Sequence, residues 1–223
     1  MATPLTTGNP SARTTVKRSP HRGHYERETL DAILDASFVC HVGFIHDGAP
    51  YVIPSIHARV GDTLYFHGSP ASRMMRHMKE GDEVSVAVTL IDSIVVARSA
   101  FNSSLGYRSA FVIGKARPVE DPEERVVAFA AITNAVLPGR WDEARTVTRN
   151  EDKGTMLVAV PIEEYSAKIR GSEVDDEEAD YELPIWAGAI PLRTVAADPE
   201  PDPRLAEGIE LPGSVERFVA TRA

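Results

Sequence analysis

Short extended segments separated by tight turns constrain the fold of this chain more than any other feature. Residues 37–68 read SFVCHVGFIHDGAPYVIPSIHARVGDTLYFHG, in which β-branched and aromatic residues are interrupted at Asp47-Gly48 and at Gly61-Asp62. Such dipeptides between extended apolar runs are typical of hairpin turns, because glycine and aspartate accept the backbone conformations that tight turns need. The pattern therefore predicts a three-stranded antiparallel meander.

The meander leads into a segment suited to binding an anion. Ser69, Ser72 and Arg73 follow the last extended run, and the helical pattern MMRHMK ends before Gly81. Serine hydroxyls, backbone N–H groups and an arginine at the start of a helix together form a site of phosphate size. The alternative from these residues alone is that Ser72 caps the helix and Arg73 points to solvent. A strand pair that ends in a phosphate site predicts a nucleotide cofactor lying along a β-barrel.

The rest of the chain alternates between further strands and a few helices. The patterns predict helices over residues 27–36, 72–79, 122–137 and 213–223, and strands within residues 83–97, 109–120 and 156–162. Within residues 83–97 we expect two strands that turn near Asp92-Ser93, because the segment is rich in β-branched residues on both sides. Residues 99–109 and 139–155 are expected to be irregular. This order predicts a mainly β, α+β fold, an antiparallel barrel with flanking helices rather than a parallel doubly wound sheet.

The two ends of the chain differ in composition from the middle. Residues 1–24 lack hydrophobic periodicity, so we expect a flexible arm without secondary structure. Residues 25–193 form the predicted domain, with a solvated acidic loop at 173–182 and an apolar segment, LPIWAGAIPL, that should dock on the body. Residues 194–223 are rich in proline and acidic side chains, which predicts a linker and tail.

Charge, hydropathy and cysteine content argue against several classes of protein. The net charge of −9 argues against a nucleic-acid-binding surface. No run of apolar residues is long enough for a membrane span, and the N-terminus lacks the apolar core of a signal peptide. The one cysteine, Cys40, lies in the apolar run FVCHVGF, which predicts a buried structural thiol in a reducing cytoplasm. His41, His46, His57 and His77 lack the spacing of a zinc site, so no metal is predicted.

Five stretches, taken in order, resemble a known protein family. They are DAILDASFVCHVGFIHDGAPYVIPSIHARVGDTLYFHGSPASRMMRHM, ARSAFNSSLGYRSAFVIGKARPVEDPEER, PGRWDEAR, EEYSAKIRG and DYELPIWAGAIPL. The ordered set resembles the pyridoxamine 5′-phosphate oxidase-like, FMN-binding split-barrel family, and within it the flavin-nucleotide-binding branch that contains nitroimidazole-resistance proteins. The resemblance covers about residues 18–193.

The resemblance implies a six-stranded antiparallel split barrel that forms a homodimer with FMN at the interface. The implied contacts are Pro54, Ser55, Ile56 and His57 beside the flavin ring, Phe66, His67, Gly68 and Ser69 along the same wall, Ser72 and Arg73 on the phosphate, Arg108 and Ser109 from the partner subunit, and Trp186 over the ring. Close relatives carry histidines and an asparagine before the YRS motif, where this chain has Asn102, Ser103 and Gly106. The chemistry that the family performs through those histidines is therefore open here.

The resemblance implies an FMN-dependent oxidoreductase that acts on a small molecule such as a nitroaromatic compound. One alternative is a flavin-binding carrier protein without turnover of its own. A second alternative is a haem-binding protein on the same barrel, with His57 and His67 as iron ligands. His67 is also the candidate for proton transfer to a substrate, the competing interpretation being a histidine held in place by packing and hydrogen bonds.

Overall fold

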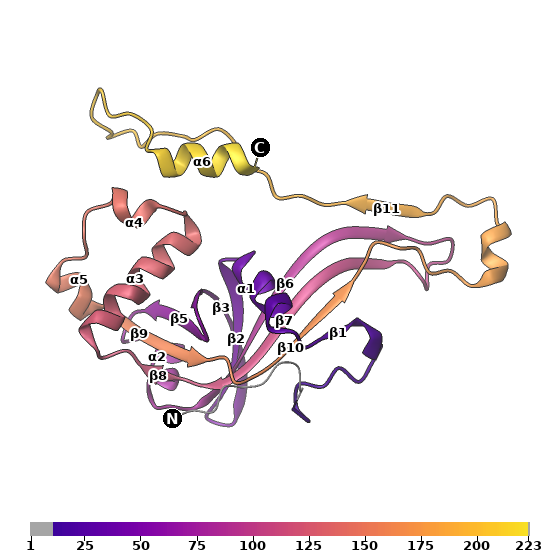
Figure 1. The fold of residues 1–223 in the computed structure, drawn as a ribbon, viewed down its shortest axis with the longest axis horizontal. Coiled ribbons are helices and arrows are strands. Elements are labelled where there is room, and N and C mark those ends of the chain that lie inside the picture. Colours follow the sequence, from indigo (N-terminus) through magenta and orange to yellow (C-terminus); the bar gives the residue numbers. More distant parts are fainter. Residues whose placement is uncertain (1–10, 223) are drawn as a thin grey trace.

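Two antiparallel sheets form the framework of the structure, a computed structural model that describes residues 11–222 (Figure 1). The seven-stranded sheet has the order β1-β10-β7-β6-β2-β3, and β11 also pairs with β6. Its strands are β1 Gly23–His24, β2 Val39–His46, β3 Ala49–Ile56, β6 Glu83–Val96, β7 Ser104–Lys115, β10 Glu164–Arg170 and β11 Gly188–Pro191. The four-stranded sheet, β4-β5-β9-β8, consists of β4 Ala58–Val60, β5 Thr63–Gly68, β9 Met156–Pro161 and β8 Arg117–Pro118. The predicted mainly antiparallel α+β fold is confirmed, with two sheets that do not close into one continuous barrel.

Short helices flank the sheets. They are α1 Arg27–Asp35, α2 Arg73–Lys79, α3 Pro122–Val136, α4 Arg140–Glu143, α5 Arg149–Gly154 and α6 Gly213–Arg222, with the 3-10 helices η1 Pro20–Arg22 and η2 Glu178–Glu182. α3 begins as predicted, because the Asp121 carboxylate accepts the N–H of Glu124 at 2.8 Å. α4 and α5 lie where a loop was expected, since helices this short show no apolar periodicity. None of the helices within residues 11–222 is both long and apolar enough to cross a membrane.

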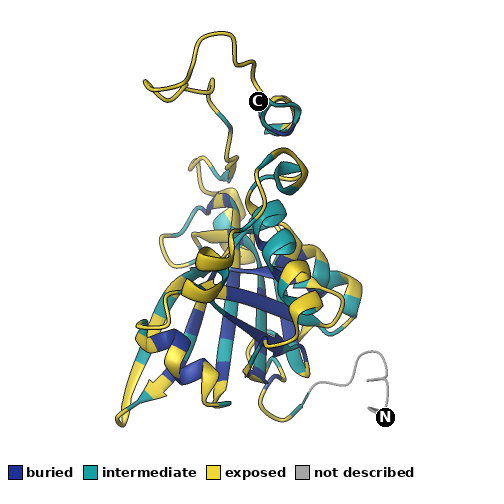
Figure 2. Ribbon diagram, turned by 90° about the vertical axis from the view of Figure 1, so that its left-hand side faces the viewer, coloured by how far each residue is buried: buried dark blue, intermediate teal, exposed yellow. Residues whose placement is uncertain are grey.

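The main apolar core lies where the two sheets meet α1 and α2 (Figure 2). Alternate residues of β2, namely Cys40, Val42 and Phe44, point into this core, and Phe66 of β5 is fully buried in it. Each fully buried apolar side chain of this size contributes roughly 1.5–3 kcal/mol. Burial raises the pKa of the Cys40 thiol to about 12, which agrees with the predicted structural thiol.

Both predicted turns are present, but the strand between them is broken. Asp47 and Gly48 have φ angles of 50° and 75°, and Gly61 has a φ of 56°, as the turns require. The expected middle strand divides into β3, which belongs to the seven-stranded sheet, and β4, which belongs to the other sheet. Between them the N–H of His57 donates to the carbonyl of Phe38 at 3.0 Å. The chain therefore changes sheets at His57, and the predicted meander of three strands has four.

β6 is one strand of 14 residues rather than the predicted pair. Its register with β7 shifts between Ile91 and Ser93, so a bulge at Asp92 absorbs the turn-like residues without reversing the chain. Arg108 on β7 pairs with Asp92 and holds this region extended. A further correction follows for the YRS motif, because Arg108 and Ser109 lie inside β7 and not at the start of a strand.

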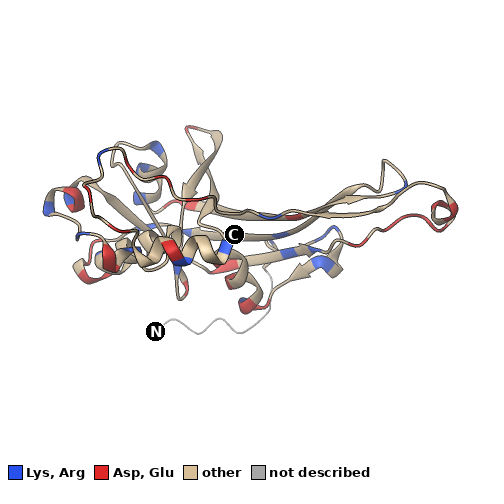
Figure 3. Cartoon of the chain, turned by 90° about the horizontal axis from the view of Figure 1, so that it is seen from above, with Lys and Arg blue, Asp and Glu red and all other residues tan. Residues whose placement is uncertain are grey.

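The C-terminal residues form an extended segment beside the body, which we call the strap and define as residues 183–222. β6 and β7 continue beyond the body as a ribbon, and the strap begins at the far end of this ribbon (Figure 1). Acidic residues of η2 lie at that end (Figure 3). β11 pairs with β6, which agrees with the predicted docking of LPIWAGAIPL, and the chain then returns to α6, the predicted C-terminal helix. The N–H of Ser214 in α6 donates to the Glu143 carboxylate of α4 at 2.9 Å.

The N-terminal arm is partly ordered. Its residues 1–10 lie outside the described residues, but residues 11–24 include η1 and the strand β1, which pairs with β10. Arg13 donates to Glu83 at 2.7 Å and also pairs with Glu164 of β10. The arm was expected to lack secondary structure, so these elements differ from the expectation. They form because β1 pairs with β10, which would otherwise be the edge strand of the sheet with unpaired backbone groups.

Candidate functional site

The free edge of β3 is the first part of the predicted flavin wall. β3 is the outermost strand of its sheet, so the N–H and C=O groups on its open side can bond a ligand, except that proline lacks an N–H. Pro54 is exposed, whereas Ser55 and Ile56 are half-buried. The Ser55 hydroxyl donates to the carbonyl of Ile56 at 3.2 Å, which leaves backbone groups as the main contacts that this segment offers.

The end of β5 offers a second open edge. β5 pairs with β9 along its whole length but with β4 only as far as Tyr65, so Phe66, His67 and Gly68 are unpaired on one side. The Phe66 side chain is 0% exposed, which means that only its backbone can reach a ligand. The His67 imidazole is exposed, and partial desolvation lowers its pKa. At neutral pH this histidine is therefore uncharged, with a nitrogen lone pair for a ligand or a proton.

Ser69, Ser72 and Arg73 gather between β5 and α2, as the sequence predicts. The Ser69 hydroxyl accepts the N–H of Ala71 at 3.2 Å, and Ser72 precedes α2 without capping it through its side chain. The Arg73 guanidinium lies over the ring of Tyr51, 4.6 Å from the centroid, and no carboxylate within residues 11–222 pairs with it. The Ser72 hydroxyl makes no cap hydrogen bond, and the Arg73 guanidinium has no ion pair within residues 11–222. This pair of groups therefore fits an anionic ligand better than the alternative in which Ser72 caps the helix.

The other predicted contacts lie away from this cluster in the same chain. Arg108 donates to both oxygens of Asp92, at 2.9 and 2.8 Å, and these hydrogen bonds lower the pKa of Asp92. Ser109 donates to the carbonyl of Lys168 at 3.3 Å. Trp186 is 66% exposed and lies two residues before β11, whose first residue, Gly188, pairs with Val96 at the end of β6. The structure thus brings together the residues of β3, β5 and α2 but leaves Trp186 remote from them.

His57 is a buried side chain rather than part of an open wall. It is 1% exposed, and its Nε2 lies 3.1 Å from the carbonyl of Leu34. Burial lowers the pKa of this imidazole, so the ring is neutral, with Nε2–H donating to the carbonyl. Its Nδ1 has no partner among residues 11–222. The ring borders a pocket of about 380 Å³ between the end of α1, β4 and α3, which no sequence motif indicated.

A larger pocket lies under the strap and was also not predicted. It has a volume of about 560 Å³ and is lined by the junction of α1 and β2, by Leu90 of β6, and by two parts of the strap, residues 193–195 and 221–222. Arg193, Val195 and Arg222 come from the strap, more than 100 residues away from the junction in sequence. The only signal in the sequence was the apolar docking segment with a helix after it. Within residues 11–222, no group of three or more acidic, His or Cys side chains is placed to hold a metal ion.

Comparison with known proteins assigns the chain to a family. A model of the family described as pyridoxamine 5′-phosphate oxidase matches residues 26–169, which include β3, β5 and α2. This chain belongs to that family. The resemblance drawn from the sequence motifs is therefore confirmed. No curated protein matches the chain with significant similarity.

Two solved structures match this family member along nearly its whole length. The flavocytochrome Anf3 from Azotobacter vinelandii is 36% identical with a TM-score of 0.88, and the match covers 94% of this chain and 97% of that one. The FAD and heme binding protein from Mycobacterium smegmatis is 37% identical with a TM-score of 0.85, covering 89% and 97%. A proposed 5-nitroimidazole antibiotic resistance protein from Bacteroides thetaiotaomicron shares the fold, at 22% identity and a TM-score of 0.57 over 66% and 86%.

Proposed function

We propose that this chain is a redox protein that binds both a flavin and a haem. The observation that carries the proposal is the match of two proteins, one described as a flavocytochrome and one as binding FAD and haem, across 94% and 89% of this chain. Coverage this high extends well beyond residues 26–169 and includes part of the strap. A bound flavin supplies one- and two-electron redox chemistry, and a bound haem supplies one-electron chemistry.

The flavin phosphate is proposed to lie against Ser69, Ser72 and Arg73. The unpaired Arg73 guanidinium and the free Ser72 hydroxyl support this placement, because charge-assisted hydrogen bonds are what a phosphate requires. The ring would lie along the open edges of β3 and β5, where backbone groups orient it. The sequence predicts FMN, whereas the relative from Mycobacterium smegmatis is described as binding FAD, which has the same flavin end.

Of the two histidines predicted as haem ligands, one fits that role in this structure. His57 does not fit as an iron ligand, because its Nε2 is bonded to the carbonyl of Leu34 and its ring is 1% exposed. His67 fits, because its imidazole is exposed, its pKa is lowered and no side-chain hydrogen bond within residues 11–222 engages it. We therefore propose His67 as the residue that holds haem, in place of its expected role in proton transfer.

A second copy of the chain is proposed to complete the flavin site. The outer face of the seven-stranded sheet exposes Ile45 at 59% and Val52 at 68%, with Val39 and Pro54 beside them. An exposed apolar sheet face of this kind is typical of a dimer interface. In such a dimer, Trp186 of one chain would lie against the flavin site of the other chain, whereas it does not reach the site of its own chain. The buried thiol of Cys40 is consistent with the cytoplasmic location that we propose.

The test is a cofactor assay on matched variants. The purified wild-type protein is expected to show flavin absorption together with a Soret band, and its extracted flavin identifies FAD or FMN. Arg73→Ala should weaken flavin binding about tenfold or more, because it removes a charge-assisted contact. Arg76→Ala, an exposed arginine on the same helix, is the control and should bind normally. Equal flavin affinity in both variants would contradict the phosphate site.

Turnover separates an oxidoreductase from a carrier. Reduction by a nicotinamide donor, followed by reoxidation with a nitroaromatic compound, is expected of the oxidoreductase. A protein that keeps its flavin but exchanges no electrons with any donor and acceptor pair would be the carrier. His67→Ala should abolish the Soret band while leaving the flavin spectrum in place, and an unchanged Soret band would assign haem to other residues.

A further inference from the structure

The pocket under the strap has the dimensions and the walls of a ligand site. Its volume of about 560 Å³ lies within the range of small-molecule and cofactor pockets. One wall is formed by Phe38 and Val39, which join α1 to β2, together with Leu90 of β6. The basic wall is formed by Arg193 and Arg222 of the strap. The pocket thus has an apolar wall and a basic wall.

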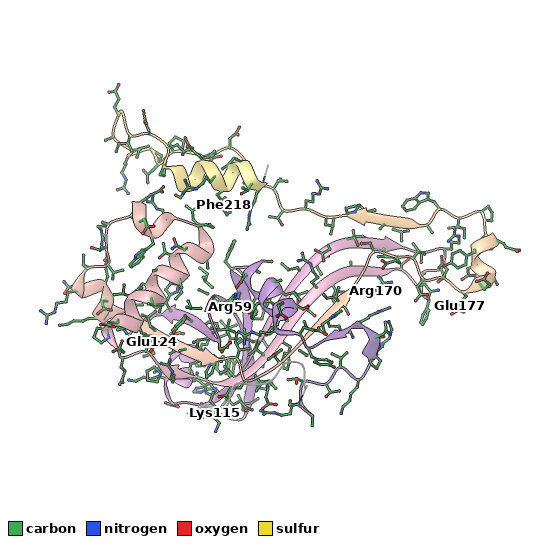
Figure 4. The ribbon with its side chains drawn as sticks, in the orientation of Figure 1. Arg59, Lys115, Glu124, Arg170, Glu177 and Phe218 are labelled. Atoms are coloured by element: carbon green, nitrogen blue, oxygen red, sulfur yellow. The ribbon has the colours of Figure 1, made fainter. Side chains whose placement is uncertain are left out.

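The basic wall is held in place by contacts at three points. The N–H of Leu192 donates to the carbonyl of Asp92 at 2.9 Å, directly before Arg193. The N–H of Ala196 donates to the carbonyl of Arg222 at 2.8 Å, which joins the two arginine-bearing parts of the strap to each other. α6 is in turn bonded to α4 through Ser214. These contacts fix the backbone that carries both arginines, and α6, marked by Phe218 in Figure 4, lies above the body.

The two arginines carry charge that no other described residue neutralises. No carboxylate within residues 11–222 forms an ion pair with Arg193 or Arg222, and the Arg222 guanidinium lies 4.6 Å from the centroid of the Phe218 ring. Most arginines of the body, such as Arg59 and Arg125, are paired with aspartates or glutamates. In a chain with a net charge of −9, two unpaired arginines at one pocket favour an acidic ligand.

We propose that the strap pocket binds the acidic end of a planar cofactor, with Arg193 and Arg222 on its phosphate or carboxylate groups and the apolar wall against its ring. This inference rests on the proposed flavin and haem binding, and it assigns part of that binding to the strap. Two cofactor groups share the required chemistry. One is the adenosine end of FAD with its own phosphate, and the other is the porphyrin edge of haem with its propionates. The strap lies outside the family match at residues 26–169, whereas the matches to the flavocytochrome and to the FAD and heme binding protein include part of it.

The decisive experiment compares two double variants with the same change of charge. Arg193→Gln with Arg222→Gln removes the basic wall, and Arg149→Gln with Arg204→Gln removes two exposed arginines elsewhere. Each protein, stripped of cofactor, is titrated with FAD, FMN and haem, using flavin fluorescence and the Soret band. Loss of one charged contact weakens binding about tenfold or more. A variant with lysine at both pocket positions should restore part of the affinity.

The pattern of losses identifies the ligand. Weaker FAD binding with unchanged FMN and haem binding supports the adenylate end of FAD in the pocket, and weaker haem binding alone supports the propionates. Unchanged affinity for all three ligands in the pocket variant overturns the inference, while Arg73→Ala still tests the flavin phosphate site independently. If the wild-type protein binds neither flavin nor haem, the proposed function and this inference both fail.

Discussion

The body and the strap of this protein are stabilised in different ways. In the body, apolar side chains such as Phe66, Val86 and Leu157 are at most 1% exposed. In the strap, Ile190 is 47% exposed, Val195 is 64% exposed and Trp186 is 66% exposed. The body is therefore held by burial of its own side chains, whereas the strap is held by strand pairing and a few polar contacts.

This difference indicates which part needs a partner. A packed core is complete without other molecules, but apolar side chains that remain exposed on an ordered segment favour binding of a ligand or another chain. The strap also carries Arg193 and Arg222 over a pocket. We infer that the body determines the fold, and that the strap contributes to binding.

The largest expected effect comes from truncating a core side chain. Phe66→Ala should lower the free energy of unfolding by about 3–5 kcal/mol, because the buried ring leaves a cavity. Ile190→Ala, on the exposed face of the strap, should change it by less than about 0.5 kcal/mol. Urea denaturation of both variants measures the contrast. Similar losses in the two variants would show that the strap belongs to the same cooperative core.

A moderate effect is expected at the contact between α6 and α4. Hydrogen bonds from Ser214 lower the pKa of Glu143 from its ordinary value of 4.5. The carboxylate therefore stabilises the docked helix above about pH 4.5, and this contribution is lost as the pH falls through the lowered pKa. Hydrogen exchange in α6 should speed up severalfold between about pH 6 and pH 3, after correction for intrinsic exchange.

Glu143→Gln is the matched control for this effect. The amide keeps an acceptor oxygen but does not titrate, so α6 should be equally protected at both pH values. If the wild-type helix shows no pH-dependent protection either, the contact with Glu143 does not hold α6 in place.

The smallest expected effect concerns the ion pair in the ribbon. Arg108 and Asp92 have side chains 40% and 39% exposed, so Arg108→Gln should cost less than about 1 kcal/mol of stability. If a second copy brings Arg108 to the flavin, the same variant should weaken flavin binding far more than it weakens folding. Parallel thermal melts and flavin titrations distinguish a binding role from a purely structural one.

The candidate site was predictable where it depends on local sequence. Ser69, Ser72 and Arg73 lie within five residues of one another, so one strand-to-helix connection brings them together. The role of His57 was not predictable, because the pattern of alternating apolar residues continues through it and does not reveal that the chain changes sheets there. The position of Trp186 was not predictable for a related reason, since β6 continues through the bulge at Asp92 instead of turning back, and this carries the ribbon away from the body (Figure 1).

The sequence alone determined the turns at Asp47-Gly48 and Gly61-Asp62, the cap of α3, the family and the grouping of Ser69, Ser72 and Arg73 before α2, because each depends on residues close together in the chain. Only the tertiary structure decided that Phe66 and His57 are buried, and that Arg193 and Arg222 share a pocket with the α1–β2 junction. Those arrangements depend on contacts between segments that are far apart in the sequence. Strand pairing and helix docking bring these segments together, and no local sequence pattern encodes the packing between them.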